Sequence, residues 1–219
     1  MKKILIFILS VFPSLIFSQS SPFTDVFPIV NGKVVYSEVI QVEGKSVLDL
    51  YKNAKIWLVE AFKSSKDVIQ NDDKDNHIII GKGYFEGVGH NKNIVNAKYW
   101  FTIRIDCREG RYKYTITDFI YDFDVIVMGT KTHFNEDFSK WGNVAFDTKY
   151  KELLDKKYPP NNERNAKQQE KYEKYKEELD NELEGKYKET IGRYSLLDKQ
   201  IKSMIESLNI AMKQSEDNW

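Results

Sequence analysis

The sequence predicts an α+β fold, in which an antiparallel sheet carries two helices packed on one face. Two observations lead to this prediction. Apolar residues recur at helical spacing in residues 47–62 and again in residues 195–213, which indicates two amphipathic helices. Between them, three segments alternate apolar and polar residues and are joined by polar turns. Strands that follow one another through tight turns pair antiparallel, so these segments should form the sheet.

The first strand and the first helix are marked most clearly. Residues 34–42 (VVYSEVIQV) are rich in β-branched side chains and alternate roughly, and Gly44 ends the strand. Ser46 precedes Asp49 by three residues, a spacing typical of the capping box that begins a helix. We expect this helix to continue to Phe62 and to turn its apolar stripe toward the sheet.

Three more strands follow, predicted at residues 76–86, 97–107 and 112–123. Glu109 and Gly110 lie between the last two segments and indicate a hairpin turn. The alternation changes phase near Asp118 and Phe119, which predicts a β-bulge. Cys107 alternates with the residues that should face the core.

The last third of the chain is charged and has a helical period. Residues 163–190 carry many charges of both signs, and a stripe of tyrosine and leucine continues through them to Met212 at a mean spacing of about 3.6 residues. This pattern allows one long helix, or two helices separated near Gly192, with Ser195 and Asp198 beginning the second. We favour two helices, with the later one on the sheet and the charged one projecting.

The segment between sheet and charged helix has no clear period. Residues 124–150 are predicted to be irregular, although their aromatic residues imply some packing against the domain. Those residues are Phe134, Phe138, Trp141 and Phe146.

The first 18 residues are typical of a secretory signal peptide. Lys2 and Lys3 precede an apolar run, and the small residue Ser18 marks the expected cleavage site. The run is shorter than the roughly 20 residues that span a membrane, so no stable membrane span should remain after processing. We expect an exported protein of the periplasm, the cell surface or the extracellular medium. The expected organisation is a signal peptide at 1–18, an extended lead-in at 19–31, the α+β domain at 32–123 and 195–213, and an insertion at 124–194.

Charge and cysteine content narrow the possible functions. The chain has 33 basic and 33 acidic residues, and loss of Lys2 and Lys3 leaves the mature chain near −2. Nucleic-acid binding needs clustered, unopposed lysine and arginine, so no nucleic-acid partner is expected. Cys107 is the only cysteine, which excludes an intramolecular disulfide and leaves stability to the core.

Four segments together resemble a known family. They are GKVVYSEVIQVEGKSVLDLYKNAKIWLVEAF, DVIQNDDKDNHIIIGKGYFEG, YWFTIRIDCREGRYKYTITDF and IKSMIESLNIAM. They look like domain-of-unknown-function family 4468, and the resemblance covers roughly residues 32–123 and 195–213. It implies a TBP-like fold in an exported protein of Bacteroidota. The family brings no established activity, so it assigns no functional residues. The TATA-box protein itself grips DNA with a duplicated domain, whereas this chain has one copy.

No pattern in the sequence predicts a catalytic residue, a metal site or a cofactor. The histidines are too scattered for a zinc site. They are His77, His90 and His133. Aspartates near residue 73 look like the start of a calcium loop. Counted from Asp73, however, Ile78 stands where glycine is required and Tyr84 where glutamate is required.

Two further patterns are weaker still. Gly81, Lys82 and Gly83 resemble part of a phosphate-binding loop, but they lie within a strand pattern, where a close approach of the backbone is the better interpretation. Acidic residues within and just after the last predicted strand could act as acid and base, but nothing in the sequence places two of them across a cleft. They are Asp118, Asp122 and Asp124.

The remaining candidate is the sheet face that the helices leave open. An indole beside a guanidinium on such a face could bind a flat or extended ligand, or a partner protein. The alternative is that the face is solvated, or that residues 124–150 cover it. The candidate binding residues are Trp100, Thr102, Arg104, Lys113, Thr115 and Thr117.

The sequence therefore favours a non-catalytic binding or interaction module of the bacterial periplasm or cell surface. The alternative from another class is an envelope hydrolase whose site is assembled from scattered aspartates and histidines. Weak self-association through residues 163–190 is a further possibility, because their tyrosine and leucine stripe is narrow.

Overall fold

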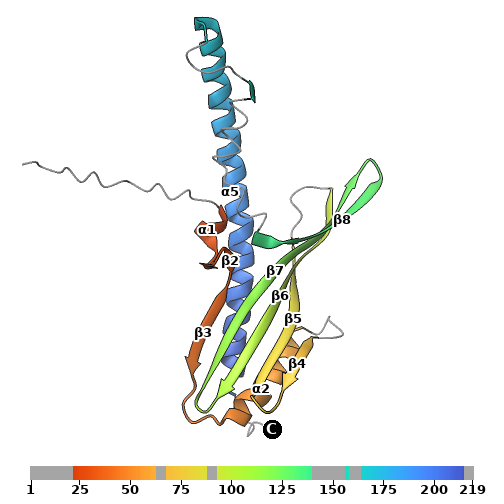
Figure 1. Cartoon of the computed structure of the whole chain (residues 1–219), viewed down its shortest axis with the longest axis vertical. Helices are drawn as coiled ribbons and strands as arrows, with labels where there is room; N and C mark the ends of the chain where they lie inside the picture. The colour runs from red at the N-terminus through yellow and green to blue at the C-terminus, as the bar shows by residue number, and fades with distance from the viewer. Residues whose placement is uncertain (1–21, 63–67, 88–92, 140–155, 158–163, 215–219) are drawn as a thin grey trace, which may run out of the picture.

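The computed structural model of the chain describes residues 22–62, 68–87, 93–139, 156–157 and 164–214 (Figure 1). Three helices lie in these residues. They are α1 (Pro22–Val26), α2 (Val47–Ala61) and α5 (Ala166–Ala211). The strands are β1 (Ile29–Val30), β2 (Lys33–Val34), β3 (Tyr36–Gln41), β4 (Ile69–Asp73), β5 (Ile78–Glu86), β6 (Ile94–Arg108), β7 (Arg111–Val127) and β8 (Thr130–Asp137).

Six of the strands form one antiparallel sheet in the order β3-β7-β6-β5-β4. Strand β8 pairs with the distal half of β7, on the edge whose proximal half pairs with β3. The long β6–β7 hairpin turns at Gly110, which adopts a positive φ of 67° that suits glycine. The predicted antiparallel sheet is confirmed.

The bulge predicted from the change of phase is present. The β6–β7 register shifts between Trp100 and Thr102, where Asp118 has a φ of 54°. A second shift lies between Val95 and Lys98, beside Asn96. The two bulges allow β7 to curve while its core-facing residues stay on one side.

Both long helices lie against the same face of the sheet, as predicted (Figure 1). Helix α2 begins at Ser46, whose hydroxyl accepts a hydrogen bond from the Asp49 amide at 3.1 Å. The helices also touch each other, since the Trp57 indole N–H donates to the Ser207 hydroxyl at 2.9 Å. The core between helices and sheet includes fully buried residues from each layer. Among them are Leu50, Leu58, Phe101, Ile103, Ile116, Ile201 and Leu208.

Helix α5 is a single helix, so the break favoured near Gly192 is wrong. It begins with a complete capping box between Asn165 and Gln168. Asp198, expected to cap a second helix, instead accepts a hydrogen bond from the Tyr36 hydroxyl at 2.6 Å. The Asp198 side chain therefore links α5 to β3 of the sheet rather than capping a helix. As predicted, the charged part of α5 projects beyond the domain (Figure 1).

Three short segments differ from the prediction. Part of the expected extended lead-in forms α1, whose Phe23 is fully buried against α5. Residues 69–73 form β4, which was not predicted because its polar residues NDD are typical of a turn. Residues 124–137 are regular, because β7 extends to Val127 and β8 pairs with it, so the sheet continues into the expected insertion.

Two of the four aromatic residues expected to pack in this segment do so. Phe138 is buried and contacts Phe23 edge-on, and Phe134 stacks on Phe123. Trp141 and Phe146 lie outside the described residues. No helix in the described part of the chain is both long and apolar enough to cross a membrane.

Candidate functional site

The candidate site is the sheet face opposite the helices, which we call the open face. Residues directly opposite one another in an antiparallel pair share a face. The β6–β7 register pairs Thr102 with Thr117, Arg104 with Thr115, and Asp106 with Lys113. Together with Trp100, these pairs place all six candidate binding residues on the open face. In the described part of the chain no helix lies over it (Figure 1).

An aromatic pair with two lysines forms one end of the open face. The ring centroids of Trp100 and Tyr84 are 4.7 Å apart. The Lys98 ammonium lies 4.5 Å from the Tyr84 centroid, and the Lys82 ammonium lies 5.3 Å from the Trp100 centroid. At such distances the ring faces attract the cations. We call these four residues the aromatic–lysine cluster.

The opposite end of the open face is a basic hollow of about 640 Å³. Four cations line it, and they are Arg104, Arg108, Arg111 and Lys113. Asp106 is the acidic residue in the lining, and the Arg104 guanidinium donates to both of its oxygens, at 2.9 and 2.6 Å. These hydrogen bonds raise the pKa of Arg104. The other cations of the hollow lie on exposed side chains, so an anionic ligand would meet a favourable field here.

The threonines between the two ends are only partly available. The Thr115 hydroxyl is 3.0 Å from the Ser37 hydroxyl on β3. Thr102 and Thr117 are half-buried and face each other across the ladder. They can add hydrogen bonds to a ligand that lies along the strands.

One histidine does meet aspartates, on the β7–β8 hairpin. His133 Nδ1 is 3.0 Å from the Asp124 carboxylate, which also accepts from Asn96 and Lys131, both at 2.8 Å. These partners, Lys131 foremost, lower the pKa of Asp124, so the group stays ionised. His133 is 59% exposed. This arrangement joins β6, β7 and β8.

Asp122 also lies near His133, 3.8 Å from its Nε2. The remaining described candidate groups do not join them. His77 packs edge-on against Tyr51, and His90 lies outside the described residues. Asp118 is exposed and lies 3.9 Å from Lys33. Burial raises the pKa of Cys107 to about 12, which keeps it a thiol. Within the described ranges, no group of three or more His, Cys, Asp or Glu residues could hold a metal ion.

Sequence reasoning missed five charged or aromatic residues on the open face, and they are Lys82, Tyr84, Lys98, Arg108 and Arg111. Lys82 and Tyr84 come from β5, whose register pairs Tyr84 with Trp100 and Lys82 with Thr102. Lys98, Arg108 and Arg111 extend the alternation of strands already predicted. Alternation within β6 and β7 could have identified these three. The contribution of β5 depends on the pairing register, which one sequence does not specify.

The chain is similar to one known family. Residues 36–122 match the family described as a domain of unknown function (DUF4468) with TBP-like fold. The resemblance stated above and its fold are thereby confirmed. No curated protein matches the chain significantly.

Two solved structures are also similar. One is a TBP-like protein from Parabacteroides distasonis ATCC 8503, with 16% identity and a TM-score of 0.44, over 83% of this chain and 96% of that one. The other is a DUF4468 family protein from Bacteroides ovatus ATCC 8483, with 15% identity and a TM-score of 0.48, over 90% of this chain and 96% of that one.

Proposed function

Residues 36–122 of this chain match the DUF4468 family and its TBP-like fold, and from that premise we propose a non-catalytic binding module of the bacterial periplasm or cell surface. Its open face binds an extended anionic ligand. The class that uses all features of the face is an acidic polysaccharide, which combines flat sugar rings, hydroxyl groups and repeated carboxylates.

The observation that carries this proposal is that one face holds both the aromatic–lysine cluster and, at its opposite end, the basic hollow. Six cations lie on this face, and they are Lys82, Lys98, Arg104, Arg108, Arg111 and Lys113. They share the face with the acidic residues Asp73, Glu86, Asp106 and Asp122. The basic excess is therefore concentrated at the hollow, where four cations stand against Asp106. A half-buried indole and phenol among them offer flat apolar surface to a sugar ring. Long-range attraction would then bring an anionic polymer to the face.

The proposal also includes where the protein acts, outside the cytoplasm, and that it comes from a bacterium of the Bacteroidota. Lys2, Lys3 and the apolar run that ends near Ser18 support export. The resemblance to an exported family of Bacteroidota supports the same address. Sequencing the N-terminus of the protein purified from its host would test this, with a start at residue 19 expected.

Binding to polygalacturonate, a polymer of a uronic acid, tests the open face. We expect Trp100→Ala to weaken binding about tenfold, because one aromatic platform of this kind contributes roughly 1–2 kcal/mol. The double change Arg108→Glu with Lys113→Glu should weaken it more and reduce its salt dependence. Isothermal titration calorimetry at several salt concentrations measures both effects.

Two matched variants and two other polymers complete the experiment. Ile56→Ala removes an exposed apolar side chain from α2, and Lys167→Glu reverses an exposed charge on α5. Neither should change binding. Neutral dextran should not bind. If polyglutamate binds as well as polygalacturonate and Trp100→Ala has no effect, charge alone acts and the polysaccharide proposal fails.

The alternative remains an envelope hydrolase, and the contact between His133 and Asp124 is the observation that favours it. Assays on ester, peptide and glycan substrates test this class. We expect no turnover above background. Activity that disappears in His133→Ala, Asp118→Ala or His90→Ala would replace the binding proposal by the hydrolase.

A further inference from the structure

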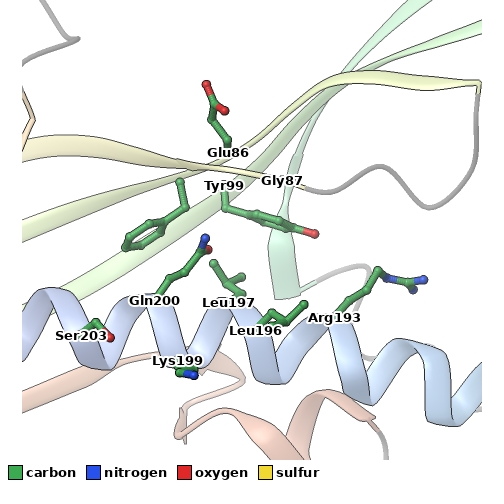
Figure 2. A pocket seen from close by; sticks show the side chains of 10 residues that line it. Glu86, Gly87, Tyr99, Arg193, Leu196, Leu197, Lys199, Gln200 and Ser203 are labelled. Carbon is green, nitrogen blue, oxygen red and sulfur yellow. The ribbon is translucent and has the colours of Figure 1, made fainter.

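A second candidate site lies on the helix side of the sheet, away from the open face. The β5–β6 edge and α5 enclose a groove of about 420 Å³, within the size range of small-molecule sites. Figure 2 shows Arg193, Leu197 and Gln200 rising from α5 toward the strands, with Tyr99 above them. We call this hollow the α5 groove.

The walls of the α5 groove are largely apolar. Phe85 and Tyr99 contribute from the strands, and Leu196 and Leu197 from the helix. Leu196 is 58% exposed, so a large apolar side chain is left at the mouth of the groove. A ligand with an apolar body would cover it.

The groove continues along α5 beyond its own lining. A neighbouring hollow shares Phe85 and Ser203 with it and extends to Met204 and Phe62. Arg193 and Ser203 are ten residues apart on the helix, which is about 15 Å at the helical rise. The two hollows together therefore follow α5 over a length that suits an acyl chain.

Arg193 supplies one cation at the end of these two hollows, and its side chain is 18% exposed. Its two terminal nitrogens donate within the helix, to Glu189 at 2.6 Å and to Thr190 at 3.1 Å. Its Nε is buried and finds no acceptor among the described residues. A buried donor without an acceptor is unfavourable, and an anionic oxygen of a ligand would satisfy it.

The other charged groups of the lining do not compete for this position. Figure 2 shows the Glu86 carboxylate on the far side of its strand and Lys199 pointing away from the strands. The Tyr99 hydroxyl points toward the Arg193 end of the groove (Figure 2). Burial raises the pKa of Tyr99, so its hydroxyl stays neutral, and it also interacts with the Tyr121 hydroxyl.

We propose that the α5 groove binds a linear monocarboxylate, with the carboxylate at Arg193 Nε and the chain along Leu197 toward Met204. The site lies on the other side of the sheet from the open face, although Tyr84 borders its second hollow. It would let the protein carry or sense a fatty acid or a similar single-chain anion independently of any polymer.

Decanoate is the probe, with decanol and decyltrimethylammonium as neutral and cationic molecules of equal chain length. Isothermal titration calorimetry on the full chain should show binding of decanoate alone. Arg193→Gln should weaken it about tenfold or more, because a charge-assisted hydrogen bond is lost. Glu189→Gln keeps the guanidinium and removes its carboxylate partner, so binding should be equal or tighter.

A blocking variant and methyl NMR locate the bound chain. Ser203→Trp fills the groove from an exposed helix position and should abolish binding. Glu206→Trp places the same ring on the outer side of α5 and should not. Decanoate should shift the methyl signals of Leu196 and Leu197 and leave those of Leu48 on α2 unchanged.

The proposal is overturned if the three probes bind alike, or if Arg193→Gln or Ser203→Trp binds decanoate as the wild type does. Trp100→Ala should leave decanoate binding unchanged. A failure of the polysaccharide proposal would therefore leave this one standing, and the reverse holds too.

Discussion

At the scale of residues, two glycines explain how α2 approaches β5. A Cβ on Gly81 would lie 2.8 Å from Leu58, and one on Gly83 would lie 2.7 Å from the Phe62 ring. Both distances are shorter than real Cβ contacts, so the strand needs glycine where the helix packs. The two glycines that made this segment resemble a phosphate-binding loop are therefore explained by the packing of α2 against β5.

Gly83→Ala should destabilise the fold by about 1–3 kcal/mol, the usual cost of overpacking a core. Phe62 and Phe101 would both have to move, because the new methyl group would contact each of their rings. Urea unfolding measures the change. Gly185→Ala makes the same chemical change on α5, with nothing within 4 Å, and should stabilise slightly. Equal effects of the two variants would contradict this account.

Asp124 is the second residue with a specific expectation. Its pKa is lower in the folded protein than in the unfolded chain. The ionised carboxylate therefore stabilises the fold above the unfolded pKa near 4, and that contribution is lost as the pH falls below it. The difference in Tm between wild type and Asp124→Asn should be full at neutral pH and shrink from about pH 4 downward.

Asp118→Asn is the control for this pH series. Asp118 is exposed and lies 3.9 Å from Lys33, so the change should alter Tm little at any pH. A Tm difference for Asp124→Asn that stays constant down to pH 2 would show that the carboxylate charge does not matter.

At the scale of elements, α5 shows that tertiary contacts can outweigh a local capping pattern in the sequence. Ser195 and Asp198 look like the start of a helix, yet Asp198 lies inside α5 and pairs with Lys202 at 2.7 Å. The helix passes through Gly192 without interruption. Its apolar stripe continues into the core through Tyr194, Leu197 and Ile201, and that burial outweighs one glycine.

Proline at position 192 tests the continuity of α5. In one continuous helix, Gly192→Pro should cost about 3 kcal/mol or more, because it removes a hydrogen bond and clashes with the preceding turn. Gly192→Ala should instead stabilise by about 1 kcal/mol. Circular dichroism during urea unfolding measures both. A chain that tolerates the proline would have two helices.

At the scale of the whole molecule, the projecting part of α5 is the surface for which weak self-association is predicted. Its stripe already has partners in the same chain. The Lys157 ammonium lies 3.3 Å from the Tyr175 ring centroid, and the Arg164 guanidinium 3.6 Å from that of Tyr172. Tyr187 donates a hydrogen bond to Asp25 of α1. Little of the stripe is left for a second copy.

We therefore expect any association through residues 163–190 to be weak and reversible. Sedimentation velocity should show a monomer at low micromolar concentration, with slight association only in concentrated samples. Leu183→Glu places a charge on the remaining half-buried part of the stripe and should abolish it. A stable dimer at low concentration would contradict this expectation.

The sequence alone predicted the elements whose period is strong. In residues 47–62 the apolar residues recur at helical spacing, and in the segments that form β6 and β7 they alternate with polar ones. This spacing specifies the type of each element and the face that it turns toward the core. The bulge near Asp118 was visible for the same reason, since a shift of one residue moves every side chain to the other face. These are local properties of the chain.

Long-range contacts determined the rest. Segment 69–73 is a strand because β5 supplies its hydrogen bonds, and residues 130–137 are one because β7 does. Likewise, Tyr84 lies beside Trp100 because of the register between β5 and β6. Arg193 and Tyr99 line the same groove because α5 packs on the sheet. Period and capping describe neighbours along the chain, whereas both candidate sites consist of residues that meet across it. Burial against a distant partner therefore set the positions of the residues on which the two binding proposals depend.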